Sequence, residues 1–291
     1  MRTDQFQLHA RLEQTHWWFV GRRQILRTLV ERLVTPHAGK LVIDVGCGTG
    51  GNIAALADAY ECYGIDTSRD AIELARRRFP RVQFLRGQAP GDLGTLFQRA
   101  DLLLLMDVLE HVRDDAGLLG KLVKAATPGT RLLLTVPADA ALWSQHDLSF
   151  GHYRRYDLQG FCRLWEGLPV TLSMVSYFNA RLYPAVRLVR AWSRFRHMPA
   201  GDAGTDFRLP SRPINHMLSS LLAGERKTLL DLLSGRTSQG YRAGVSLIAV
   251  IQRTEDCLAS SHAANDTPRQ VGLPVMPLIE PTPTGQPSGI G

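Results

Sequence analysis

The chain has 291 residues, of which 44% are hydrophobic and 21% are charged, and its formal net charge is +7. These values lie near the averages of globular proteins and exclude a wholly disordered chain. No apolar run reaches the ~18 residues of a membrane-spanning helix, and the first residues are too polar for a secretory signal. We therefore expect a cytoplasmic protein whose basic charge favours phosphates, nucleic acid or a membrane surface as partners.

The first 38 residues predict a helical cap that precedes the main domain. Between Arg22 and Leu33, apolar residues recur at helical spacing, and Pro36 ends this helix. The aromatic run His16–Phe19 stands just before it. Its tryptophans either line a binding cavity or fasten the helix to the domain.

Strand-like and helix-like segments then alternate along the chain. The strands lack polar alternation, so we expect them to be buried on both faces, as in a parallel sheet. This order predicts an α/β fold with a doubly wound, Rossmann-like sheet. The expected strands are 41–45, 62–65, 82–85, 101–106 and 131–136, and the expected helices are 52–59, 68–79 and 114–126.

The second half of the chain is less regular. We expect a helix at 157–165 and strands at 171–178 and 244–251. Residues 179–243 are too long for a simple connection and predict a helical insertion before the last strand. Residues 39–254 then form the main domain, and the tail 255–291, which has six prolines and no aromatic residue, is expected to be disordered.

The first strand runs into a glycine-rich turn. Gly46, Gly48 and Gly51 fit the dinucleotide-binding pattern, and Asp66 ends the next strand, where a carboxylate can bind ribose hydroxyls. Asp44 lies in the strand just before the turn and would repel a pyrophosphate. It suits the cationic part of S-adenosylmethionine instead. An NAD(P)-dependent oxidoreductase stays as an alternative.

Four segments resemble, in order, the motifs of class I S-adenosylmethionine-dependent methyltransferases: DVGCGTG at 44–50, GIDTS at 64–68, DLLLLMDVLEHV at 101–112 and TPGTRLLLTVP at 127–137. Within this family the chain resembles the type 11/12 methyltransferases and is similar to the ubiquinone-biosynthesis O-methyltransferases. The resemblance implies S-adenosylmethionine as cofactor. It also implies a seven-stranded sheet with an antiparallel last strand, which fits the strand expected at 244–251.

The same resemblance implies the donor site. The family usually has an acid after the third strand, whereas this chain has Gln88, whose side-chain oxygen can accept a hydrogen bond from an adenine amino group. Asp66 would bind the ribose hydroxyls. The expected donor-binding residues are Asp44, Gly46, Cys47, Gly48, Gly50, Asp66, Thr67, Gln88, Ala89 and Asp107.

The segment DVLEH at 107–111 is similar to the Glu-x-x-Glu-His segment of metal-dependent O-methyltransferases. Glu110, His111 and the downstream His152 are therefore the candidate catalytic residues and the candidate ligands of an Mg²⁺ ion; His146 is a second choice for the downstream histidine. Without a metal, His111 or His152 would take the proton of the acceptor. The stretch 142–156 is expected to be a loop that shapes the acceptor pocket.

Residues 180–197 predict a basic amphipathic helix. Such a helix either packs its apolar face on the domain or lies in the interface of a membrane, here the inner face. No RNA-binding module accompanies it, so nucleic acid is not expected as a partner. We expect O-methylation of a lipid-linked, quinone-like or glycosyl small molecule, with a non-catalytic S-adenosylmethionine-binding protein as a further alternative. The oligomeric state does not follow from the sequence.

Overall fold

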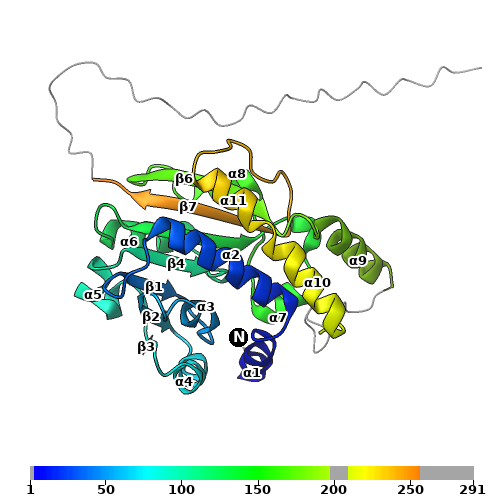
Figure 1. Cartoon of the computed structure of the whole chain (residues 1–291), viewed down its shortest axis with the longest axis horizontal. Helices are drawn as coiled ribbons and strands as arrows, with labels where there is room; N and C mark the ends of the chain where they lie inside the picture. Colours follow the sequence, from blue (N-terminus) through cyan, green and yellow to red (C-terminus); the bar gives the residue numbers. More distant parts are fainter. Residues whose placement is uncertain (1–2, 197–208, 256–291) are drawn as a thin grey trace, which may run out of the picture. The chain divides into compact units, whose positions relative to one another are not determined.

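The computed structural model describes residues 3–196 and 209–255, built around a seven-stranded sheet in the order β3-β2-β1-β4-β5-β7-β6 (Figure 1). The strands are β1 (Leu41–Val45), β2 (Glu61–Asp66), β3 (Gln83–Arg86), β4 (Leu102–Met106), β5 (Arg131–Pro137), β6 (Val170–Phe178) and β7 (Ser246–Arg253). Strand β7 is antiparallel to β5 and β6, and the other pairs are parallel. The predicted Rossmann-like sheet with an antiparallel last strand is confirmed.

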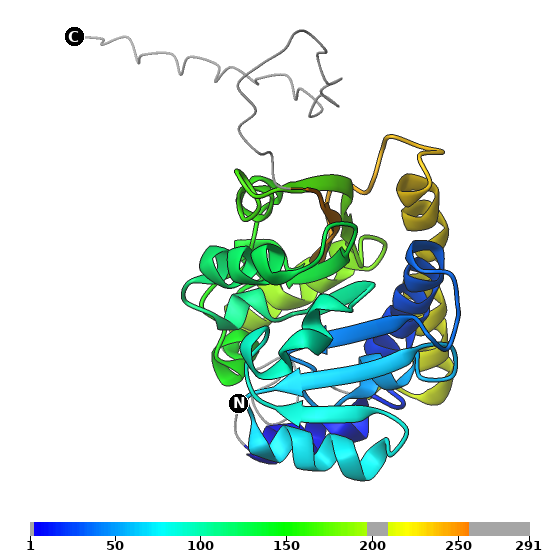
Figure 2. The same ribbon diagram turned by 90° about the vertical axis from the view of Figure 1, so that its left-hand side faces the viewer.

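Helices cover both faces of the sheet (Figure 2). Helices α2, α4, α10 and α11 pack on one apolar cluster, and α5, α6 and α8 pack on the other. The helices are α1 (Thr3–Leu12), α2 (Trp17–Leu33), α3 (Gly51–Ala54), α4 (Arg69–Arg78), α5 (Thr95–Gln98), α6 (Asp115–Ala125), α7 (Gln145–Phe150), α8 (Leu158–Arg163), α9 (Tyr183–Arg196), α10 (Arg212–Ala223) and α11 (Arg226–Leu233).

Two predicted segments differ from the structure. The helix expected at 52–59 ends at Ala54, because the amides of the next three residues bond the carbonyl three residues back in tight turns, as from Leu56 N to Ile53 O at 3.0 Å. The loop expected at 142–156 contains α7. Its first turn is stabilised by a capping box in which Ser144 and Asp147 bond each other's backbone amides.

The N-terminal helices and the insertion pack on each other. Helix α10 lies along α2, and Asn215 accepts a hydrogen bond from Trp17 N at 2.9 Å and donates one to Thr15 O at 2.7 Å. A Cβ atom at Gly21 would lie 3.0 Å from Leu222 Cβ, so the close contact of the two helices requires this glycine. The insertion thus supports the expected cap at 1–38 from outside.

No helix in the described ranges is long and apolar enough to cross a membrane. The tail expected to be disordered lies outside the described residues, apart from Glu255.

Candidate functional site

A cavity of about 920 Å³ lies at the carboxyl ends of the central strands. Ligand pockets commonly measure ~300–1,000 Å³, so this one has room for a methyl donor and an acceptor together. Eleven of the predicted site residues line it: Gly46, Cys47, Gly48, Asp66, Thr67, Gln88, Ala89, Asp107, Glu110, His111 and His152. The structure thus brings together residues from three of the four sequence motifs with Gln88, Ala89 and His152, which lie outside the motifs.

The loop after β1 is shaped by glycines and by Asp66. Gly46 and Gly48 have φ values of 75° and 52°, a left-handed backbone that favours glycine. Asp66 Oδ2 accepts a hydrogen bond from Gly48 N at 2.9 Å, and its Oδ1 accepts one from Ser68 N at 2.8 Å. These bonds hold the carboxylate at the cavity wall, and each oxygen keeps a lone pair for a ligand hydroxyl.

Two predicted contact residues, Asp44 and Gly50, do not line the cavity. A Cβ atom at Gly50 would lie 2.6 Å from the ring of Phe84, so this glycine allows close packing behind the loop. Asp44 is only 1% exposed, and neither of its carboxylate oxygens has a hydrogen-bond partner. Burial, with a smaller contribution from Asp66 and against the influence of Arg22, raises the pKa of Asp44 to about 8. Without a ligand Asp44 is therefore mostly protonated at neutral pH, and a cation bound on the other side of the wall would favour its ionised form.

The raised pKa of Asp44 predicts a pH effect on stability without ligand. Because the folded protein keeps a proton on Asp44 between pH ~4 and ~8 and the unfolded chain does not, the unfolding free energy falls over this range. Asp44→Asn removes that contribution. Urea unfolding at pH 5 and pH 8.5 measures how far the unfolding free energy falls between these pH values. This decrease should be at least ~2 kcal/mol smaller in Asp44→Asn than in the wild type. Parallel pH profiles of the two proteins would contradict this.

The N-terminal helices close the donor side of the cavity. Phe6 and His9 of α1 and Glu13 just after it line the cavity, and the buried Glu13 accepts a hydrogen bond from Thr49 Oγ1 at 2.8 Å and pairs with Arg78. Trp17 and Trp18 also line the cavity while packing against the core. The tryptophans thus serve both of the roles that the sequence left open.

Arg22 of α2, to which the sequence assigned no role, is buried beside Asp107, the residue that follows β4. It forms an ion pair with Asp107, donates to Thr135 Oγ1 at 2.8 Å and stacks over the ring of Trp18 at 4.7 Å. Thr135 in turn donates to Asp107 Oδ1 at 3.0 Å. Asp107 has a φ of 61°, a strained value for a residue with a side chain. The signal in the sequence was an arginine on the apolar stripe of α2.

Asp147 is a second residue that the sequence did not single out. It is buried, accepts from Arg155 Nε at 2.8 Å and from Ser144 N at 2.9 Å, and contacts His152 Nδ1 at 2.9 Å. Burial raises the pKa of Asp147, but the hydrogen bonds from His152 and Arg155 outweigh burial and hold the pKa below its usual range. Asp147 is therefore ionised at neutral pH and fixes the ring of His152.

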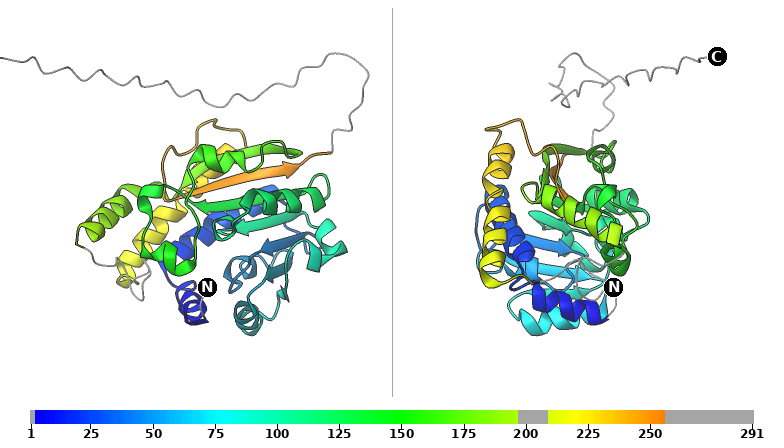
Figure 3. Two further views of the ribbon diagram at one scale, coloured as in Figure 1. Left: turned by 180° about the vertical axis from the view of Figure 1, so that it is seen from behind. Right: turned by 90° about the vertical axis from the view of Figure 1, so that its right-hand side faces the viewer.

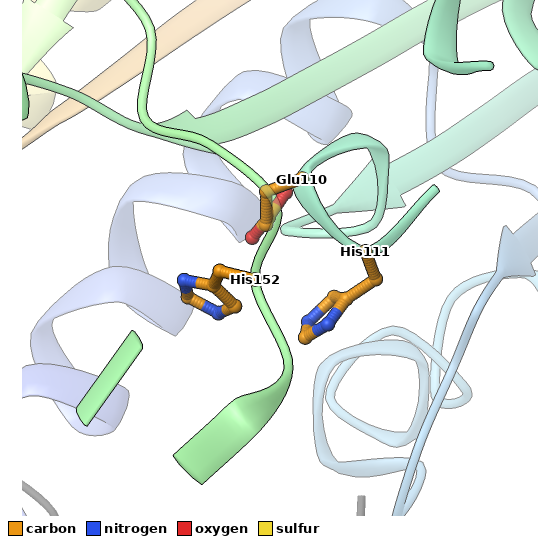
Figure 4. Close-up of side chains that lie close together, drawn as sticks. All are labelled: Glu110, His111 and His152. Atoms are coloured by element: carbon orange, nitrogen blue, oxygen red, sulfur yellow. The ribbon is translucent and has the colours of Figure 1, made fainter. Parts of the chain in front are cut away.

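Glu110, His111 and His152 point toward one another at the cavity wall (Figure 4). One potential ligand atom from each lies within 4.8 Å of the others, and the two imidazole rings meet edge to face at 4.7 Å. Glu110 is fully buried, and neither carboxylate oxygen has a hydrogen-bond partner. Burial and the neighbouring Asp107 raise the pKa of Glu110 well above its usual value.

The histidines of this region differ in their environments. Burial and the nearby His152 lower the pKa of His111 to about 4, so His111 is neutral at pH 7. His146 also lines the cavity, but it packs on Phe150 at 4.5 Å, and burial lowers its pKa to about 3. Of the two downstream histidines, His152 is the one that joins Glu110 and His111.

The insertion forms the far wall of the cavity. Leu182, Val186, Val189 and Arg190, all in or just before α9, line it. Asn179, which precedes this helix with a φ of 52°, is buried and also lines the cavity, and its side-chain oxygen has no hydrogen-bond partner. The helix expected at 180–197 thus turns one face toward the site, which the sequence pattern did not indicate.

Comparisons with known proteins find methyltransferases. Trans-aconitate 2-methyltransferase of Acidovorax sp. (strain JS42) is 28% identical over 246 residues, which cover 80% of this chain and 88% of that protein. The enzyme of the same name from Methylobacterium radiotolerans is 36% identical over 111 residues, or 37% of this chain; the chain spans 42% of that relative's length.

A solved chain from the complex between a Haloferax volcanii methyltransferase activator and a methyltransferase has the same fold. Its TM-score is 0.51 at 14% identity, with 87% of this chain and 95% of that chain covered. Residues 19–170, more than half of the chain, match the methyltransferase-domain family. The chain therefore belongs to the class I S-adenosylmethionine-dependent methyltransferases, with S-adenosylmethionine as the cofactor.

Proposed function

We propose that the chain transfers the methyl group of S-adenosylmethionine to a hydroxyl oxygen of an acceptor bound between the cluster Glu110–His111–His152 and α9. One observation carries this proposal. A buried, ionised Asp147 holds His152 by its Nδ1 at 2.9 Å, which leaves Nε2 to receive the proton of the acceptor. Family membership favours this function over the NAD(P)-dependent alternative.

The reaction is an in-line displacement at the sulfonium methyl group. The bond from carbon to sulfur breaks, a bond from carbon to the acceptor oxygen forms, and the hydroxyl proton passes to His152. Ionised Asp147 stabilises the imidazolium that results. Asp66 and the loop at Gly48 position the donor, and the cationic end of the donor would favour the ionised form of the buried Asp44 behind the loop.

The far wall of the cavity supports an acceptor with an apolar body. The side chains of Ala185, Val186 and Val189 line it beside Arg190, a wall that suits a lipid-linked or quinone-like molecule better than a bare sugar. Both relatives compared above are named trans-aconitate 2-methyltransferase. A carboxylate acceptor of that kind has no proton to lose, so it would leave His152 without a role.

The product separates these two acceptors. We expect the methyl group that the protein transfers to a cell extract to survive mild alkali, because an ether is stable under conditions that hydrolyse a methyl ester. The measurement is the fraction of labelled methyl retained after alkali treatment of the purified product. Complete release of the label as methanol would show that the product is a methyl ester and that the acceptor is a carboxylate.

The same three side chains fit a divalent cation. Glu110 offers a buried carboxylate with no hydrogen-bond partner, and the two imidazoles lie within 4.8 Å of it. Two nitrogen ligands and one oxygen ligand suit Mn²⁺, Fe²⁺ or Zn²⁺ better than the Mg²⁺ expected from the sequence, since Mg²⁺ prefers oxygen ligands. When bound, the ion would lower the pKa of the acceptor hydroxyl.

This donor set predicts metal binding without turnover. We expect the protein, dialysed free of metal, to bind one Mn²⁺ per chain in a calorimetric titration, and Glu110→Gln to weaken binding at least ~tenfold. His146→Ala is the matched control, because His146 lines the cavity outside the cluster. If neither Mn²⁺ nor Zn²⁺ binds at millimolar concentration, the cluster has no metal and His152 acts as a base alone.

A further inference from the structure

Helices α9 and α10 carry most of the exposed large apolar side chains among the described residues. Leu188, Trp192 and Phe195 on α9 are 72%, 58% and 80% exposed. On α10, Ile214, Met217 and Leu221 form a second exposed stripe. Both helices lie at the same end of the sheet (Figures 1 and 3). We call these six residues the α9–α10 surface.

The α9–α10 surface adjoins the cavity. The inner face of α9 lines the cavity with Ala185, Val186 and Arg190, and Leu218 of α10 lines it as well. Val189 belongs to both faces, since it lines the cavity and is 55% exposed. Helix α9 is therefore apolar on two sides, although a solvated helix normally has one apolar stripe. Its outer stripe, formed by Leu188, Trp192 and Phe195, is on the same helix as the residues that line the cavity.

The segment that carries these stripes is rich in arginine. Residues 179–224 contain seven arginines (Arg181, Arg187, Arg190, Arg194, Arg196, Arg208 and Arg212) and only two acids, Asp202 and Asp206. Apolar stripes with an exposed tryptophan, on a segment with an excess of arginine, match the interface of an anionic bilayer, where apolar side chains enter the headgroup boundary and arginines meet lipid phosphates.

We propose that the α9–α10 surface docks the mouth of the cavity on an anionic phospholipid membrane, so that an apolar acceptor enters from the bilayer. The proposal rests on the proposed function only for the nature of the acceptor; the docking itself depends on the surface alone. Because Leu188, Trp192 and Phe195 do not line the cavity, their loss should leave donor binding intact.

Cosedimentation with vesicles tests the docking. We expect the full chain to sediment with phosphatidylcholine vesicles that contain phosphatidylglycerol, and at least ~tenfold less with pure phosphatidylcholine. The triple variant Leu188→Ser, Trp192→Ser, Phe195→Ser should lose at least ~tenfold in binding to the anionic vesicles. Leu172→Ser is the matched control: Leu172 is 42% exposed on β6, away from this surface, and its loss should change nothing.

Tryptophan fluorescence shows which side chain enters the lipid. Anionic vesicles should shift the emission to the blue in the wild type, and Trp192→Phe should remove the shift, since the other four tryptophans are buried or half-buried. Absence of vesicle binding would overturn the proposal, as would equal losses in the triple variant and Leu172→Ser. A dimer in sedimentation velocity that the triple variant abolishes, without vesicle binding, would assign the surface to a second copy of the chain.

Donor binding and methyl transfer, measured on the same samples, separate this proposal from the proposed function. Vesicle binding with no transfer to any lipid-phase acceptor would overturn the acceptor assignment and leave the docking in place. Transfer to an apolar acceptor with no vesicle binding would overturn the docking and leave the acceptor assignment in place.

Discussion

His152→Ala is expected to lower kcat ~10²–10⁴-fold and to leave the dissociation constant of S-adenosylhomocysteine unchanged. The acceptor hydroxyl then loses the group that takes its proton, while the donor loop is untouched. Asp147→Asn should produce part of the same loss, because it removes the charge that orients the His152 ring and stabilises the imidazolium. Single-turnover transfer from labelled S-adenosylmethionine at saturating acceptor measures both effects.

His146→Ala is the matched control for this prediction. His146 lines the same cavity, but it packs on Phe150 and lies outside the cluster of Glu110, His111 and His152. Its replacement should leave kcat close to that of the wild type. Equal losses in both variants would reduce His152 to a packing role, and full activity of His152→Ala would remove it from the chemistry.

Asp66→Ala should weaken S-adenosylhomocysteine binding at least ~tenfold, because charge-assisted hydrogen bonds contribute ~1.5–3 kcal/mol each. The substitution removes the proposed ribose contact and also the acceptor that holds Gly48 N and Ser68 N. Isothermal titration calorimetry measures the change, with NADH as a ligand that should not bind.

Asp58→Ala controls for the loss of an aspartate as such. Asp58 is exposed, pairs with Arg27 and does not line the cavity, so its loss should not alter the affinity. If Asp66→Ala binds S-adenosylhomocysteine as tightly as the wild type, Asp66 does not bind the ribose.

The sheet could be predicted because its signals are local. Strands β1 and β4 are buried along their whole length, and continuous apolar runs such as Leu102–Met106 are typical of such strands. Each predicted strand lies within two residues of its observed position. The glycine turn was equally readable, since three of its glycines adopt left-handed φ values that few other residues tolerate.

The contacts that position the site could not be predicted, because they join residues far apart in the chain. Arg22 meets Asp107 across two layers of the fold, and nothing in the sequence pairs them. Asp147 was read as part of a loop, although its capping box with Ser144 starts a helix that brings it under His152. The sequence pattern of α9 did not indicate which of its apolar residues line the cavity and which are exposed.

The most direct test of the account is methyl transfer from labelled S-adenosylmethionine into an extract of the cells that contain this protein, followed by partition between butanol and water. We predict label in the butanol phase with the wild-type chain and background label with His152→Ala. Label confined to the water phase, with equal amounts from the two proteins, would contradict both the apolar acceptor and the role of His152.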